Sequence, residues 1–134
     1  MDTTENIGIT FYQSLGKLFY AIAAADKVVR KSEYISLRNL VKSEWLAVDD
    51  LEDEFGADAA FQIEIVFDWL DYSELQAESS FNEFASFYKE NKSLFTDRIK
   101  QLIWNTSNSI ANAFSGKNKS ELMMLGRLKL IFEE

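Results

Sequence analysis

The chain has 134 residues, the length of one compact domain, and its formal net charge is −8. Its 47% hydrophobic and 14% aromatic residues exclude a disordered chain, and its 27% charged residues exclude an integral membrane protein. It contains no cysteine and no histidine, which excludes disulfides, thiol nucleophiles, histidine-based catalytic triads and ordinary zinc sites.

The N-terminal segment does not have the pattern of a targeting signal. Residues 1–5 are acidic and polar, whereas a secretory signal begins with basic residues and continues with an apolar core. The longest apolar run, residues 18–25, has eight residues, far fewer than the roughly 20 that span a bilayer. We therefore expect a cytoplasmic protein with no direct membrane insertion.

Helical spacing of apolar residues dominates the chain, which has no proline and five glycines. The first predicted helix runs up to Asp26. Its apolar stripe consists of Phe11, Leu15, Leu18, Phe19 and Ile22. A second helix is predicted over residues 31–46, with Leu37, Leu40 and Val41 on one face.

The most apolar predicted helix spans residues 57–70, and its apolar side chains surround much of its circumference. We expect it to be central, with Trp69 in the core. Residues 73–76 have the Ser-x-x-Gln form of a capping box, which predicts another helix. That helix should turn Phe81, Phe84 and Tyr88 inward. Two more helices are predicted over residues 94–114 and 119–132, and a short helical turn near residues 49–55 stays open.

An internal repeat appears at a shift of 88 residues without a gap. Ile22, Ala23 and Ala25 lie over Ile110, Ala111 and Ala113. In the same register Lys31, Ser32 and Glu33 lie over Lys119, Ser120 and Glu121, and Leu37 and Leu40 lie over Leu125 and Leu128. These matches have the form of a duplicated helix-loop-helix hairpin, although two amphipathic hairpins could also share such residues by chance.

The predicted fold class is all-α: a compact bundle of six to seven helices with two pseudo-twofold-related helical hairpins. The whole chain, residues 1–134, is predicted to be one domain. The hairpins span about residues 7–46 and 94–133, and an acidic middle segment of about residues 47–92 separates them.

The loop after the first predicted helix resembles a known family. Residues 25–33, Ala-Asp-Lys-Val-Val-Arg-Lys-Ser-Glu, resemble the Ala-Asp-Gly-x-Val-x-x-x-Glu signature of the TerB-like tellurite-resistance family. That family also includes the domain preceding the J-domain in a DnaJ-like co-chaperone. The resemblance implies one all-α domain, a divalent-cation site made by acidic residues and a role in stress-response assemblies. Lys27 stands where the family usually has glycine, and Phe114 where the second hairpin would repeat the aspartate.

Asp26 and Glu33 match the acidic positions of that signature, and Glu121 matches in the second hairpin. Because the chain offers only oxygen ligands, an ion bound by Asp26 and Glu33 would be Ca²⁺ or Mg²⁺. The sequence favours a structural role instead. Asn118 and Glu121 have the spacing of an N-cap and an N3 residue, Glu33 has the same place in the first hairpin, and Asp26 suits a turn.

Charge is distributed unevenly along the chain. Residues 1–42 hold four acids and six bases, residues 43–88 hold thirteen acids and no base, and residues 89–134 hold five acids and eight bases. Such an acidic segment repels nucleic acid and anionic lipid and attracts either a protein with a basic face or cations, which it would bind weakly and diffusely. The densest part, which we call the acidic cluster, consists of Glu44, Asp49, Asp50, Glu52, Asp53, Glu54 and Asp58.

Two other interpretations of this charge stay open. The acids could form a solvated face that only keeps the protein soluble. Bases of the flanking hairpins could also neutralise them, or lie exposed and let copies associate weakly, head to tail. The flanking bases considered are Lys27, Arg30, Lys31, Lys117 and Lys119.

The sequence therefore predicts a non-catalytic, TerB-like module that serves as a stress-response accessory or protein-docking domain, with weak divalent-cation binding as an open feature. No catalytic residue is assigned. The alternative is a small carboxylate- and Mg²⁺-dependent hydrolase or phosphate-handling enzyme. That alternative requires several carboxylates converging in a cleft, whereas a docking module displays dispersed acids on a shallow surface.

Overall fold

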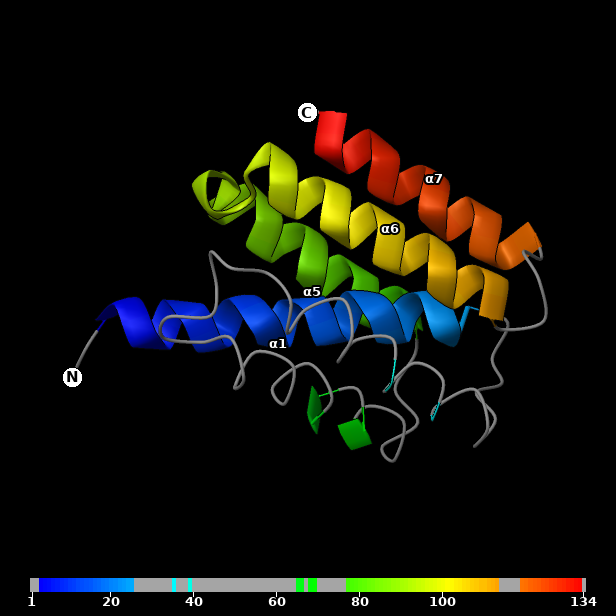
Figure 1. Cartoon of the computed structure of the whole chain (residues 1–134), viewed down its shortest axis with the longest axis horizontal. Coiled ribbons are helices and arrows are strands. Elements are labelled where there is room, and N and C mark those ends of the chain that lie inside the picture. The colour runs from blue at the N-terminus through cyan, green and yellow to red at the C-terminus, as the bar shows by residue number, and fades with distance from the viewer. Residues whose placement is uncertain are drawn as a thin grey trace.

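The computed structural model describes residues 3–25, 35, 39, 65–66, 68–69, 77–113 and 119–133. Every element in these ranges is helical, so the all-α prediction holds for this part of the chain. The elements are α1 (Thr3–Ala23), α5 (Ala77–Glu90), the 3-10 helix η1 (Lys92–Leu94), α6 (Asp97–Ala113) and α7 (Lys119–Glu133) (Figure 1). The other helices predicted from the sequence lie largely outside these residues, although Ile35 and Asn39 are helical.

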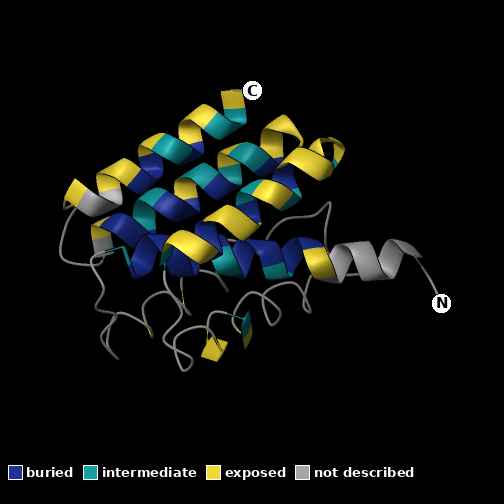
Figure 2. Ribbon diagram, turned by 180° about the vertical axis from the view of Figure 1, so that it is seen from behind, coloured by how far each residue is buried: buried dark blue, intermediate teal, exposed yellow. Residues whose placement is uncertain are grey.

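Helix α1 lies across one side of the other described helices and contacts α5, α6 and α7 (Figure 1). The predicted apolar stripe is buried, and burial extends around the circumference of its last turn, where Tyr20, Ala21, Ile22 and Ala23 are all buried (Figure 2). A helix buried on all sides needs small side chains somewhere on its surface so that neighbours can approach. The alanines at the end of α1 supply them.

An aromatic cluster joins α1, α5 and α7 at the turn between α5 and α6. Phe95, directly after η1, is its hub. Its ring centroid lies 5.1 Å from that of Phe11 in α1, 4.9 Å from Tyr88 in α5 and 6.4 Å from Phe132 in α7. Phe84 also contacts Phe95, at 6.0 Å. Edge-to-face arrangements dominate, which is a favourable geometry for ring pairs. The inward placement predicted for Phe81, Phe84 and Tyr88 is confirmed.

Helix α6 begins three residues later than the sequence predicts. Instead of starting near Leu94, it starts at Asp97 after the separate turn η1. The physical reason is an N-cap: the Oγ1 of Thr96 accepts a hydrogen bond from the backbone N–H of Ile99 at 3.2 Å. Asp97 adds a negative charge in the first turn, where it suits the helix dipole.

Helices α6 and α7 pack against each other as an antiparallel hairpin (Figure 1). The residues of α7 that face inward are Met124, Leu125 and Leu128. This confirms the inward placement predicted for the two leucines of the second repeat. The helix begins at Lys119, so Glu121 stands in its first turn, where the capping interpretation expects it.

Burial in α1 and α6 follows the register of the 88-residue repeat. The pairs in which both members are buried are Phe11 and Ile99, Leu15 and Ile103, Leu18 and Thr106, Phe19 and Ser107, Ile22 and Ile110, and Ala23 and Ala111. Helix α1 is also buried at Tyr12, Ser14, Tyr20, Ala21 and Ala24, whose equivalents in α6 are more exposed. The two helices therefore present the same face to the core, while α1 is covered on more sides.

The expectation that Trp69 lies in the core is wrong. Its side chain is 58% exposed, and that of Ile65, one helical turn earlier, is 56% exposed. Val66 is half-buried and packs against the core. Residues 65 and 69 share one side of a helix and residue 66 lies about 100° away from residue 65, so of these three described residues Val66 packs against the core while Ile65 and Trp69 lie exposed. Apolar residues on all sides of a helix do not ensure that every side is buried, because burial also requires neighbouring segments to cover that side.

We expect alkaline pH to weaken the fold through Tyr12. This residue is buried beside the ring of Phe11, and its burial raises the pKa of its hydroxyl above the ordinary value of about 10. Above about pH 10 the hydroxyl of Tyr12 loses its proton in the unfolded chain and keeps it in the folded chain. The free energy of unfolding is therefore at its full value below pH 10 and falls as the pH rises. The loss approaches about 1.4 kcal/mol per pH unit.

Urea unfolding of the wild type and Tyr12→Phe between pH 9 and 11 measures this effect. The free energy of unfolding of the wild type should fall more steeply than that of the variant, which keeps the ring and lacks the titrating hydroxyl. Parallel pH dependences would show that Tyr12 does not carry the effect.

Candidate functional site

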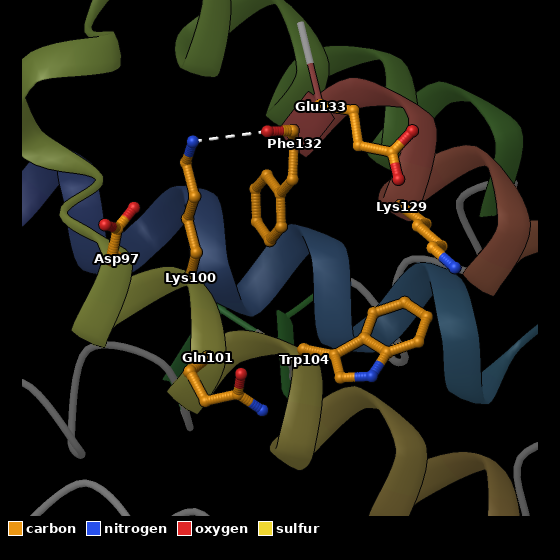
Figure 3. A pocket seen from close by; sticks show the side chains of 7 residues that line it. All are labelled: Asp97, Lys100, Gln101, Trp104, Lys129, Phe132 and Glu133. Atoms are coloured by element: carbon orange, nitrogen blue, oxygen red, sulfur yellow. Dashed lines mark hydrogen bonds between the residues drawn. The ribbon is translucent and has the colours of Figure 1, made fainter.

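A surface pocket of about 430 Å³ lies between α6 and the end of α7 (Figure 3). Helix α6 contributes Asp97, Lys100, Gln101 and Trp104, which follow one another at helical spacing along one side. Helix α7 contributes Lys129, Phe132 and Glu133 from its last turn. The antiparallel packing of the hairpin brings the first turns of α6 beside the last turn of α7, and this arrangement creates the pocket.

Lys100 contacts both the end of α7 and the aromatic cluster. Its Nζ donates a hydrogen bond to the backbone carbonyl oxygen of Phe132 at 3.2 Å (Figure 3). The same ammonium lies 5.6 Å from the ring centroid of Tyr88 and 5.8 Å from that of Phe132. The last carbonyls of a helix have no partner within the helix, and a cation there also suits the helix dipole. Lys100 therefore caps α7.

The pocket combines two ammonium groups, two carboxylates, an amide and an indole. Its carboxylates, Asp97 and Glu133, come with an equal number of lysines, so they do not form the convergent acidic cleft that the hydrolase alternative requires. Within the described ranges, no group of three or more acidic residues could hold a metal ion.

Two acids of helix α5 pair with bases of the flanking helices. Arg127 of α7 places its Nη1 2.6 Å from a carboxylate oxygen of Glu78, and its guanidinium also contacts Asn82 and lies 4.3 Å from the centre of the Phe81 ring. The Nζ of Lys17 in α1 lies 3.7 Å from a carboxylate oxygen of Glu83. Helices α1 and α7 thus neutralise two acids near the C-terminal end of the acidic segment. The bases that do so, Lys17 and Arg127, are not among the flanking bases predicted from the sequence.

The ion pair of Glu78 and Arg127 is expected to couple by about 0.5–1 kcal/mol, because both side chains remain partly in water. A double-mutant cycle with Glu78→Gln and Arg127→Gln, measured by urea unfolding, gives this coupling energy. It should shrink in 1 M NaCl, which screens exposed charges. A coupling energy that does not respond to salt would contradict an exposed charge–charge interaction between these two side chains.

The site residues predicted from the sequence lie outside the described part of the chain. This holds for Asp26 and Glu33, the predicted cation ligands, and for the whole acidic cluster, residues 44–58. None of the described residues that line the pocket between α6 and α7 belongs to the site residues predicted from the sequence. The sequence did not predict this pocket because its residues belong to two separate helices, and the packing of the hairpin brings them together.

Comparison with known proteins leaves the chain without a match: no family model, no curated protein and no solved structure resembles it significantly. The described helices include none that is both long and apolar enough to cross a membrane.

Proposed function

We propose that this chain is a non-catalytic, TerB-like helical module that docks a protein partner with a basic face through the acidic cluster. In this proposal the module is a cytoplasmic accessory component of a stress-response assembly of the tellurite-resistance type. Its complete fold is a bundle of six to seven helices, in which two related hairpins pack about a pseudo-twofold axis.

The charge distribution carries this proposal. Thirteen acids and no base occupy residues 43–88. Two of these acids, Glu78 and Glu83, already have partners in Arg127 and Lys17. Both belong to α5, at the C-terminal end of the acidic segment, whereas the acidic cluster stands at its N-terminal end. Dense like charges repel one another, and a basic partner relieves that repulsion and is attracted over long distances.

The shared burial pattern of α1 and α6 supports the hairpin duplication. Six pairs of residues separated by 88 positions are buried in both helices. A duplicated hairpin keeps its core-facing positions, because each copy must bury the same stripe. The TerB-like signature, residues 25–33, follows the first of these helices in the sequence.

Pull-down from cell lysate at low and high salt tests the docking proposal. The test variant converts the seven acids of the cluster to Asn or Gln, and the matched control carries Glu78→Gln and Glu83→Gln, which remove acids engaged within the fold. We expect the wild type and the control to retain the same proteins at low salt, and the test variant and high salt to abolish retention. Recovery of the same proteins by the test variant would contradict the proposal.

Thermal unfolding separates the two roles left open for Asp26 and Glu33. A bound ion stabilises the folded chain by mass action, so a site filled by millimolar Ca²⁺ or Mg²⁺ would raise the melting temperature. That rise would be absent from the variant with Asp26→Asn and Glu33→Gln. Because the sequence favours capping, we expect melting curves with and without the ions to superimpose.

A further inference from the structure

The side of α7 that faces away from the core is unusually apolar. Leu122, Met123 and Leu130 are 51%, 62% and 65% exposed. With about 100° between successive residues, these three fall within about 60° of the direction of Gly126. We call this side the outer face of α7; its residues, all exposed, are Lys119, Leu122, Met123, Gly126, Lys129, Leu130 and Glu133. The helix lies at the edge of the described bundle, with this face directed outward (Figures 1 and 2).

The outer face is symmetric about Gly126. Leu122 stands four residues before the glycine and Leu130 four residues after it. Lys119 stands seven residues before it and Glu133 seven residues after it. An antiparallel pair of identical helices with its twofold axis at Gly126 therefore aligns leucine with leucine and lysine with glutamate.

Gly126 itself is not required by the packing of its own subunit. A Cβ atom built on it meets nothing within 4 Å. Glycine inside a helix costs about 1 kcal/mol relative to alanine. A glycine at the centre of an exposed apolar face does allow the backbone of a second helix to approach closely, as small residues do where helices cross.

We propose that the outer face of α7 is the interface of a homodimer, in which the α7 helices of two copies cross antiparallel at Gly126. Leu122 packs against the partner's Leu130, and Met123 packs against the aliphatic stem of the partner's Lys129. Lys119 pairs with the partner's Glu133, and the twofold axis repeats each contact.

The charges of the outer face favour a second copy of the chain as its partner, and they favour an antiparallel arrangement of the two helices. A second copy supplies a glutamate opposite each Lys119 and a leucine opposite each leucine, so the face is complementary to itself. A parallel pair would instead place Lys119 against the partner's Lys119 and Glu133 against the partner's Glu133, which is unfavourable. This interface is made by α7 and uses no residue of the acidic cluster, so it is independent of the docking proposal.

Analytical ultracentrifugation of the full chain over a range of concentrations tests the interface. We expect the wild type to show a monomer–dimer equilibrium and Leu130→Glu to raise its dissociation constant at least about tenfold, equivalent to 1.4 kcal/mol. Ile65→Glu, at an exposed isoleucine outside α7, is the matched control and should leave the equilibrium unchanged. A wild type that stays monomeric at all concentrations, or a dimer that Leu130→Glu does not weaken, overturns the proposal.

Charge reversal tests the antiparallel register. Lys119→Glu and Glu133→Lys should each weaken the dimer, because each places like charges opposite one another. The double variant should restore the wild-type dissociation constant. Failure of the double variant to recover would exclude this alignment.

Cysteine cross-linking gives an independent readout that needs no loss of folding or binding. The chain has no cysteine, so Gly126→Cys introduces a single thiol on the twofold axis, where the subunit has space for its side chain. Mild oxidation should convert this variant to a covalent dimer, since a disulfide joins Cα atoms about 5.5 Å apart. Asn82→Cys, on the exposed side of α5, should remain monomeric under the same conditions. Equal cross-linking of the two variants would contradict the proposed interface.

Discussion

Replacement of Phe95 with alanine is expected to lower the free energy of unfolding by about 4 kcal/mol. The ring is buried and contacts rings from three helices, at centroid distances of 5.1 Å to Phe11, 4.9 Å to Tyr88 and 6.4 Å to Phe132. Truncation removes these contacts and leaves a cavity where α1, α5 and α7 meet. A loss of this size is a large fraction of the 5–15 kcal/mol that stabilises a typical domain.

Urea unfolding measured by far-UV circular dichroism tests this expectation. Phe95→Leu is the graded control, and it should cost less because leucine refills much of the volume. Ser93→Ala, at an exposed position in η1, should change stability by less than about 0.5 kcal/mol. If Phe95→Ala were as mild as Ser93→Ala, the aromatic cluster would not hold the helices together.

Enlargement of Ala23 and Ala111 to phenylalanine is expected to destabilise the protein at both positions, by about 3 kcal/mol each. The two alanines occupy equivalent places in the 88-residue repeat, and both are essentially inaccessible. A closely packed interior has no space for a ring there, so neighbouring helices must shift.

The control for this pair is Asn112→Phe, one residue away from Ala111 on the exposed side of α6. We expect it to leave the urea midpoint nearly unchanged. Similar losses at Ala23 and Ala111 would support equivalent surroundings for the two hairpins. A large loss at one alanine and none at the other would argue against the duplication, because related hairpins should pack these positions alike.

The two proposed surfaces would serve different purposes. Dimerisation through α7 would bring two acidic clusters into one particle, so a partner with two basic sites would bind with avidity. The Leu130→Glu variant therefore offers a functional test as well. It should weaken capture of a bivalent partner while leaving the acidic cluster of each chain intact.

Local patterns in the sequence were sufficient to predict that α1, α5, α6 and α7 are helices and which sides of α1 and α5 face the core. The spacing of Phe11, Leu15 and Leu18 predicted α1. The Ser-x-x-Gln pattern of residues 73–76 predicted another helix, and α5 begins at Ala77. These predictions succeed because helix periodicity and capping depend on residues within about one or two turns of one another. The start of α6 was wrong by three residues because the Thr96 cap competes with an earlier start.

The tertiary structure alone decided which distant residues meet. Phe95 carries no periodic signal because it stands in a turn, yet it is the hub of the aromatic cluster. Trp69 is a large apolar residue of the kind usually found in a core, yet its side chain is exposed. Arg127 pairs with Glu78, which lies 49 positions away in the sequence. A sequence pattern shows which side of a helix is apolar. Whether that side is covered, and by what, depends on how segments remote in the chain pack together.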